Sequence, residues 1–200
     1  MSETKNVLRV ENVTMQFGGV VAVDDLSMEV NEGEIVALIG PNGAGKTTAF
    51  NVITGVYAPT NGQVLFDGKK VVENHPRGKM RRQYKGKHLG DYKSVLEPTP
   101  DKLTRMGMAR TFQNIRLFDN MSVEDNVRIG LHNQVRYGMI PGIFRMPGYW
   151  RGEREMHERA LDLLSIFDMQ DLANHQAGSL PYGAQRRLEI VRALATNPSL

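Results

Sequence analysis

The sequence predicts an α/β protein, and three observations support this fold class. The run Ile35–Ile39 is continuously apolar, as expected of a strand buried on both faces of a sheet. A glycine-rich segment, Gly40–Thr48, follows at once, and a helix is expected from about Lys46 to Ile53. Farther along, Arg151–Phe167 carries apolar residues at spacings of three and four, the pattern of an amphipathic helix.

Shorter elements flank these segments. Val7–Val13 and Leu26–Val30 alternate apolar and polar residues, which predicts two half-buried strands. Val64–Phe66 predicts a third strand, closed by the turn pair Asp67-Gly68. A further strand is expected at Met108–Phe112.

Two helix starts are expected in the second half of the chain. Ser122–Asp125 places a serine three residues before a carboxylate, which resembles the capping box that opens a helix. The last helix is expected to begin near Gly183.

Composition limits the classes of protein to consider. The 200 residues are 40% hydrophobic and 24% charged, which is typical of a globular domain with a sizeable core. No stretch approaches the roughly 20 apolar residues of a membrane span, and the polar N-terminus lacks a secretory signal. With no cysteine there is no disulfide and no thiolate metal site, which agrees with a cytoplasmic protein.

The net charge of +3 comes largely from one basic segment, Lys69–Lys93. A solvated surface insertion is the simplest interpretation, and contact with anionic lipid or a partner is the alternative. Nucleic acid is the least favoured partner, because Tyr84 and Tyr92 are the only aromatic residues in the segment and no recognition motif surrounds them.

The glycine-rich segment matches the phosphate-loop pattern G-x-x-x-x-G-K-[ST] in full. Its glycines allow backbone N–H groups to turn inward around an anion, at the positive end of the following helix. Lys46 adds a positive charge for the β- and γ-phosphates, and Thr47 offers a hydroxyl to Mg²⁺. The motif therefore predicts a site for a nucleoside triphosphate, ATP with Mg²⁺. The expected binding residues are Gly40, Pro41, Asn42, Gly43, Ala44, Gly45, Lys46, Thr47 and Thr48.

Three further blocks stand in order around this loop. They are Gln16–Gly19 with Ala22-Val23, then Ala109–Phe118, and finally Leu180–Leu194. With these blocks the chain resembles the ATP-binding subunits of ABC transporters, and more narrowly those that serve branched-chain amino acid uptake. The resemblance covers essentially the whole chain apart from the basic insertion.

The resemblance implies a phosphate-loop NTPase core with an antiparallel β sub-domain and a helical signature sub-domain. The expected divisions are 1–68 for the N-terminal strands and phosphate loop, 69–100 for the basic insertion, 101–118 for the Q-loop region, 119–182 for the helical sub-domain and 183–200 for the signature helix. In the family, Leu200 stands just before the strand that ends in the Mg²⁺-binding aspartate and the catalytic glutamate. We therefore expect the chain to be a partial cassette, with very slow ATP hydrolysis if the protein ended there.

The resemblance also assigns residues outside the loop. Phe17 is expected to stack on adenine, although the residue alone favours a core phenylalanine, and Val23 is expected to pack beside the nucleotide. Gln113 matches the glutamine that reaches Mg²⁺ and the attacking water, although alone it is an ordinary loop residue. Lys46 and Gln113 are the expected catalytic residues, and Thr47 and Gln113 the expected metal ligands.

The last block is expected to contact ATP held by a partner subunit, through Leu180, Pro181, Tyr182, Gly183, Ala184 and Gln185. The common family pattern begins Leu-Ser-Gly-Gly-Gln, and here proline replaces the serine. Because Pro181 has neither a hydroxyl nor a backbone N–H, weakened contacts to the partner's ATP are expected, with backbone donors near Gly183 remaining.

The predicted function is hydrolysis of ATP to power amino acid import, at the cytoplasmic face of the cell membrane. The expected partners are a second ATP-binding subunit, membrane permease subunits and, indirectly, a substrate-binding protein. Two alternatives are a non-transport ABC ATPase, and a regulatory ATP-binding protein with little catalysis, which Pro181 favours.

Overall fold

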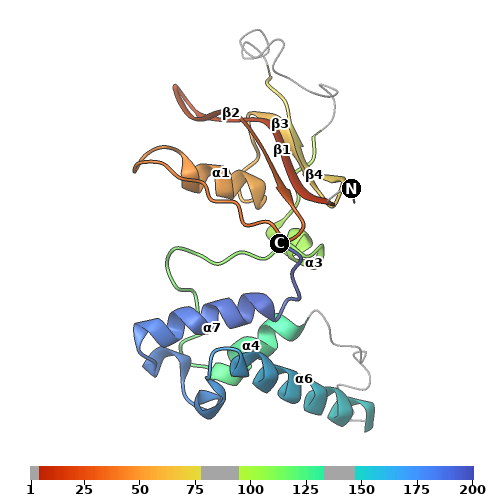
Figure 1. Ribbon diagram of the computed structural model, residues 1–200, viewed down its shortest axis with the longest axis vertical. Coiled ribbons are helices and arrows are strands. Elements are labelled where there is room, and N and C mark those ends of the chain that lie inside the picture. The colour runs from red at the N-terminus through yellow and green to blue at the C-terminus, as the bar shows by residue number, and fades with distance from the viewer. Residues whose placement is uncertain (1–4, 78–94, 133–146) are drawn as a thin grey trace. The chain divides into compact units, whose positions relative to one another are not determined.

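The computed structural model describes residues 5–77, 95–132 and 147–200, which are drawn in colour in Figure 1. The chain forms two compact units, Met1–Leu103 and Thr104–Leu200, here called the sheet unit and the helical unit. Among the helices in these described ranges, none combines the length and the apolar character that crossing a bilayer requires.

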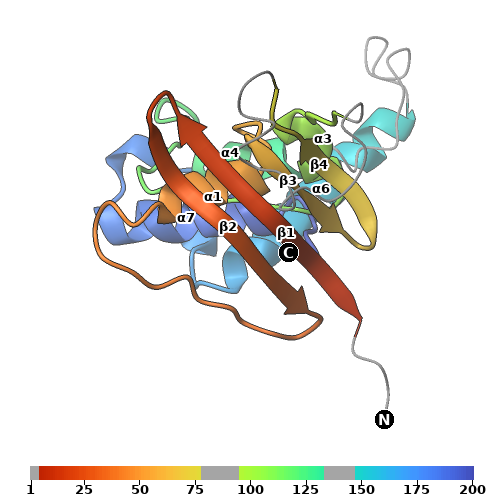
Figure 2. The same ribbon diagram turned by 90° about the horizontal axis from the view of Figure 1, so that it is seen from above.

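The sheet unit is built on four antiparallel strands in the order β2-β1-β3-β4. Their bounds are β1 Asn6–Phe17, β2 Val20–Asn31, β3 Asn61–Phe66 and β4 Lys69–Asn74. Figure 2 shows β1 and β2 as one long hairpin. The register places Val10 opposite Met28 on one side and Val64 on the other, so alternate apolar residues of β1 enter the core.

Local sequence explains the turns of this sheet. The expected turn at Asp67-Gly68 is confirmed: both residues have positive φ angles, 47° and 72°, and they connect Phe66 to Lys69 in paired strands. Helix α1, Lys46–Ile53, contacts β1 and β2 and buries Ala49, Val52 and Ile53.

The strand expected at Ile35–Ile39 is not formed, and this prediction is wrong for the structure described. The segment has no regular structure, and the side chains of Ile35 and Ile39 are 97% and 90% exposed. A central strand needs neighbouring strands that pair with it, and the described sheet ends at β2 without pairing to this run.

The basic segment is also more ordered at its start than expected. Lys69–Asn74 is not part of a loop-like insertion but forms β4, because Val71 and Val72 enter the core and the lysines remain outside. Most of the predicted basic cluster falls within residues 78–94, outside the described residues. A short helix, α3, follows at Pro100–Arg105.

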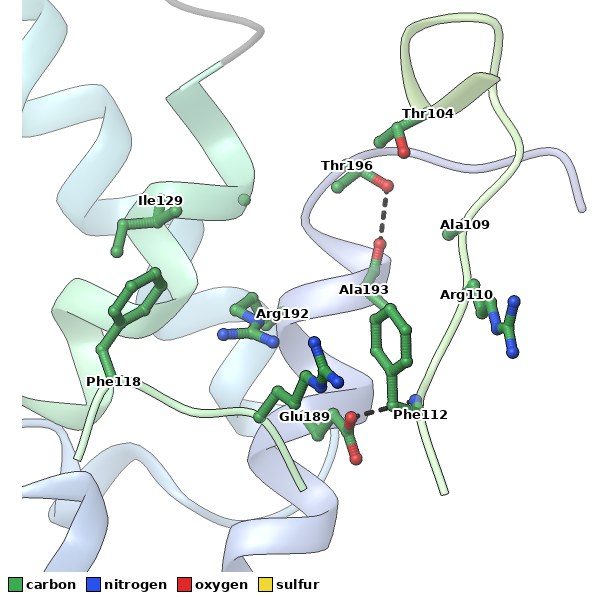
Figure 3. Close-up of a pocket in the computed structure, with 12 residues that line it drawn as sticks. Thr104, Ala109, Arg110, Phe112, Phe118, Ile129, Glu189, Arg192, Ala193 and Thr196 are labelled. Atoms are coloured by element: carbon green, nitrogen blue, oxygen red, sulfur yellow. Dashed lines mark hydrogen bonds between the residues drawn. The ribbon is translucent and has the colours of Figure 1, made fainter. Parts of the chain in front are cut away.

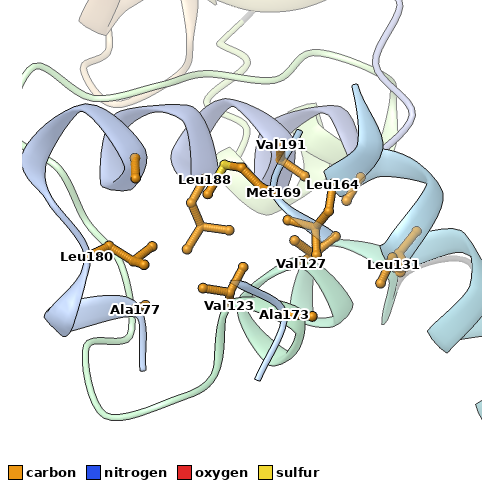
Figure 4. Close-up of a cluster of buried hydrophobic side chains, with 13 residues drawn as sticks. Val123, Val127, Leu131, Leu164, Met169, Ala173, Ala177, Leu180, Leu188 and Val191 are labelled. Atoms are coloured by element: carbon orange, nitrogen blue, oxygen red, sulfur yellow. The ribbon is translucent and has the colours of Figure 1, made fainter. Parts of the chain in front are cut away.

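The helical unit is organised around three helices, α4 Val123–Leu131, α6 Pro147–Ser165 and α7 Tyr182–Leu194. Short 3-10 turns occur at Gln170–Leu172 and Ala177–Ser179. Figure 4 shows the cluster of buried side chains that the three helices and these turns share. Its members are Val123, Val127, Leu131, Ala160, Leu164, Met169, Ala173, Ala177, Leu180, Ala184, Leu188, Val191 and Ala195.

Two local features fix the packing of α4. The expected cap at Ser122 is confirmed, since its Oγ accepts from the Asp125 N–H at 3.0 Å. Near the other end, α4 crosses α7 at Gly130, where an added Cβ would lie 2.6 Å from the Arg192 carbonyl oxygen and 2.8 Å from the Ala195 Cβ. The two helices can approach so closely only because residue 130 is glycine.

The strand expected at Met108–Phe112 is not formed either. Its first residues nevertheless bond to the chain near Leu200: the Leu200 N–H donates to the Gly107 carbonyl at 3.2 Å, and the Ala109 N–H donates to the Leu200 carbonyl at 2.8 Å. Two such bonds flanking Met108 have the pattern of a parallel pair of strands. They are too few to form a strand.

Candidate functional site

The glycine-rich loop of the sheet unit leads directly into α1. Gly43 and Gly45 both have left-handed φ angles, 85° and 79°, which turn the backbone into the helix. No side chain caps α1, and no acidic residue lies in its first turn. The N–H groups of Lys46, Thr47 and Thr48 therefore have no acceptor within the helix, and the positive end of the helix dipole lies at the same place.

The Lys46 side chain folds back across the loop. Its Nζ donates to the carbonyl oxygens of Gly40 at 2.6 Å and Pro41 at 2.7 Å. An ammonium group has three N–H donors, so these two bonds orient Lys46 over the loop and leave a third donor for an anion. Thr47 is exposed at the first turn of α1, where its hydroxyl is accessible to a cation held by phosphate oxygens.

Strand β2 closes the other side of the loop. A Cβ added to Gly45 would lie 2.1 Å from the carbonyl oxygen of Ala22 and 3.3 Å from Cγ2 of Val23. The backbone of β2 therefore packs directly on the loop, and only glycine fits at position 45. This contact brings Val23, one of the residues expected beside the nucleotide, next to the phosphate loop.

Phe17 lies at the end of β1, where the chain turns back into β2. The residue is 46% exposed, so the alternative of a core phenylalanine is wrong. It makes an edge-to-face contact with Tyr57, with ring centroids 5.7 Å apart and an interplanar angle of 82°. This contact supports one edge of the ring. Stacking on adenine stays a prediction.

The residues present fit a nucleoside triphosphate. Backbone N–H groups, a helix N-terminus and one ammonium group form a donor set that binds phosphate oxygens. In the described residues, no group of three acidic or histidine side chains is placed to hold a metal ion. Mg²⁺ takes few protein ligands when it is bound with phosphates, and an exposed hydroxyl such as that of Thr47 fits this role.

The remaining expected residues belong to the helical unit. Gln113 is exposed in the irregular segment after Phe112. In the last block, Pro181 is the N-cap of α7, and Tyr182 and Gly183 are exposed at the helix start. Their approach to a nucleotide stays a prediction.

Gln185 bonds within the last block, so its side chain faces its own helix start. Its Nε2 donates to the Leu180 carbonyl at 2.9 Å. Leu180 and Ala184 are buried in the helical core, where their side chains support the exposed residues of the block. Their contact with a partner's nucleotide stays a prediction.

A cavity of about 410 Å³ opens beside the segment that carries Gln113 in the helical unit, as Figure 3 shows. Exposed Phe118 and Ile129 give it an apolar side. Burial lowers the pKa of Arg110, and burial also lowers the pKa of Arg192, against the opposing effect of Glu189. The cavity is lined by Thr104, Ala109, Arg110, Phe112, Arg116, Phe118, Ile129, Gly130, Glu189, Arg192, Ala193 and Thr196.

A family model described as ABC transporter matches residues 23–200. The chain belongs to the ABC transporter family. The resemblance inferred from the phosphate loop and the flanking blocks is therefore confirmed.

Within this family, the chain is similar to ATP-binding proteins of branched-chain amino acid transport. The high-affinity branched-chain amino acid transport ATP-binding protein BraF of Pseudomonas aeruginosa is 38% identical over 199 residues, covering 98% of this chain and 68% of that protein. LivG of Escherichia coli K12, described in the same terms, is 39% identical over 195 residues, covering 97% and 67%.

A solved structure has the same fold as this chain. It is the ADP conformation of an ATP-binding cassette of an ABC transporter, with a TM-score of 0.70 and 32% identity, covering 98% of this chain and 66% of that one. The expected cassette fold is thus confirmed, and the chain spans about two thirds of the length of the relatives that it matches.

Sequence reasoning missed several residues that shape the site. Ala22 supplies the carbonyl that closes on Gly45, and Tyr57 supports Phe17. In the helical unit, Arg186 and Glu189 bond to the backbone of Phe112. Each contact joins residues far apart in the chain, and one sequence carries no signal that pairs them.

Proposed function

We propose that this ABC family member is the ATP-binding and ATP-hydrolysing subunit that powers import of branched-chain amino acids, or of related amino acids or amides, through a membrane permease. The phosphate loop packed against β2, with Lys46 held over it, is the observation that carries the proposal. BraF and LivG are branched-chain amino acid transport ATP-binding proteins, which supports the choice of cargo.

In this proposal the loop Gly40–Thr48 holds the phosphates of ATP. The N–H groups at the start of α1 donate to phosphate oxygens, and the Lys46 ammonium exchanges a carbonyl partner for the β- and γ-phosphates. Phe17 stacks on adenine from the end of β1, and Val23 packs beside the nucleotide. Mg²⁺, when bound, neutralises charge that develops on the phosphate oxygens, with Thr47 and Gln113 as its protein ligands.

Phosphoryl transfer depends mainly on positioning and charge stabilisation, which are the tasks of this chain's residues. Lys46 stabilises the negative charge on the transferred group. Gln113 orients the attacking water. No residue in the described ranges is assigned as the general base.

Two ATP-binding subunits would sandwich the nucleotides, each loop facing the partner's block from Leu180 to Gln185. The permease would contact the helical unit near Gln113, at the cytoplasmic face of the membrane, and a substrate-binding protein would deliver the cargo. The exposed apolar side chains of Phe118 and Ile129 beside the cavity support such a contact. No nucleic acid is required.

Pro181 favours a second candidate, a regulatory ATP-binding protein with little catalysis. A proline N-cap offers no hydroxyl and no N–H to a nucleotide on a partner subunit.

ATP turnover by the complete subunit, purified with and without the membrane subunits, separates these candidates. We expect strong stimulation by the permease, and loss of about 100- to 1,000-fold of the stimulated rate in Lys46→Ala. Nucleotide binding without turnover, even with the permease present, would support the regulatory candidate. Stimulation by RNA or ribosomes instead would overturn the transport function.

A further inference from the structure

We propose that Arg186 and Glu189 form a positioning pair that ties Gln113 to helix α7. The inference rests on the proposed function, since it concerns how the catalytic glutamine is held. Neither residue touches the nucleotide in this proposal. Both act through the backbone of Phe112, the residue immediately before Gln113.

The pair engages both polar backbone groups of Phe112. The Phe112 N–H donates to Glu189 Oε1 at 3.1 Å, a contact drawn in Figure 3, and Arg186 Nη1 donates to the Phe112 carbonyl at 2.6 Å. Arg186 Nη1 also donates to Glu189 Oε2 at 2.6 Å. One residue of the segment before Gln113 is thus fixed by a closed set of three charge-assisted bonds.

The side chain of Phe112 is held as well. The guanidinium carbon of Arg110 lies 5.2 Å from the ring centroid, and that of Arg116 lies 4.9 Å from it. Such contacts are attractive, because the negative face of an aromatic ring favours a nearby cation. Phe112 is therefore an anchor, while the next residue, Gln113, is exposed.

The burial of Glu189 supports this role. The Glu189 side chain is only 2% exposed, although it carries a carboxylate. A buried carboxylate is costly unless each oxygen has a partner, and here one oxygen takes Arg186 and the other takes a backbone N–H from 77 residues away. An ion pair that served α7 alone would need no contact with Phe112.

The bonds to Phe112 link Gln113 and the start of α7, two parts of the proposed machinery. Gln113 is expected to act on the nucleotide of its own subunit, while Tyr182 and Gly183 at the start of α7 are expected to face the nucleotide of the partner. Because the backbone at Phe112 is bonded to α7, a shift of this helix moves the start of the Gln113 segment with it. The pair therefore couples the two contributions.

The test compares Glu189→Gln and Arg186→Ala with wild type in the complete subunit assembled with its permease. The amide introduced by Glu189→Gln could still accept from the Phe112 N–H but would present no charge to Arg186. We expect the ATP-dependent kcat to fall about 10- to 100-fold, the loss that follows a misplacement of roughly 1 Å. The KM for ATP should change less than about twofold, because the phosphate loop keeps all its contacts.

Two further variants guard against general destabilisation. Arg186→Lys keeps the charge and hydrogen-bond donors and should restore part of the lost kcat. Arg151→Ala removes an arginine from an exposed pair with Glu155 on α6, and should leave the rate unchanged. Hydrogen exchange of the Phe112 amide, followed without ATP, should speed up in Glu189→Gln and Arg186→Ala only.

The outcomes distinguish this inference from the proposed function. If wild type shows no permease-stimulated turnover, the proposed function fails whatever the exchange rates. If wild type is stimulated and both variants keep its kcat while the Phe112 amide exchanges faster, the positioning role is overturned. Equal losses in Arg151→Ala would also overturn it.

Discussion

Helices α1 and α7 start in similar ways but are suited to different tasks. Neither has a capping side chain, and each has an exposed residue in its first turn, Thr47 in α1 and Tyr182 in α7. In α1 the first N–H with a local carbonyl acceptor is Ala49, bonded to Gly45. In α7 it is already Ala184, bonded to Pro181 at 2.9 Å, so two N–H groups are left at the start instead of three.

The two helix starts also differ in the residues that surround them. The start of α1 is enclosed by the loop, by Lys46 and by β2, so donors converge on one point. At Gly183 an added Cβ would meet nothing within 4 Å, so the start of α7 is open. We therefore propose that α1 binds a phosphate on its own, whereas the donors of α7 act only on a ligand held by another subunit.

Gly45→Ala should have the largest effect on this comparison, because it breaks the enclosure of α1. A Cβ at this position clashes with the Ala22 carbonyl and carries a left-handed penalty of about 1–2 kcal/mol. With overpacking of a further 1–3 kcal/mol, we expect ATP affinity to fall about 100-fold or more. Titration calorimetry with ATP would measure this loss of affinity.

Gly33→Ala is the matched control for that change. Gly33 has nearly the same φ angle, 76° against 79°, but nothing lies within 4 Å of an added Cβ. It should lower the melting temperature without lowering ATP affinity. Equal losses of affinity in the two variants would mean that the contact of β2 with the loop is unimportant.

Phe17→Ala should have an intermediate effect. Loss of stacking is expected to cost about 1–3 kcal/mol, or about 5- to 150-fold in ATP affinity, by analogy with aromatic residues that stack on bases. Val20→Ala, at the exposed register partner of Phe17, should bind ATP normally. An unchanged ATP affinity in Phe17→Ala would mean that the ring packs against Tyr57 but does not stack on adenine.

Pro181→Ser should have the smallest effect and the opposite sign. A serine N-cap stabilises a helix by about 0.5–2 kcal/mol, which raises the melting temperature by roughly 2–4 °C per kcal/mol in a chain of this size. It also adds a hydroxyl for the partner's ATP, so turnover in the assembled transporter should rise. Pro181→Ala, which lacks the hydroxyl, should not increase turnover. An unchanged rate in Pro181→Ser would mean that the position hardly matters.

Features that depend on neighbouring residues can be predicted from the sequence. The left-handed glycines before Lys46, the turn at Asp67-Gly68 and the cap at Ser122 each satisfy a local requirement of the backbone. For the same reason the phosphate loop can be recognised before any contact is known.

Features that depend on distant partners could not be predicted. Ile35–Ile39 has the composition of a central strand, but a strand forms only where another strand pairs with it. Lys69–Asn74 begins with two lysines, which favours a charged loop, although its backbone pairs with β3 and its two valines are buried. The bond between Phe112 and Glu189 joins residues 77 apart in the chain.

The glycine at which α4 and α7 cross has a mechanical consequence. The contact lies at Arg192 and Ala195, near the end of α7 that is farthest from its signature residues. Ten residues of helix separate Arg192 from Tyr182, a lever arm of about 15 Å. Rotation of α7 by about 10° around this pivot would therefore displace its tip by about 3 Å, roughly the length of a hydrogen bond.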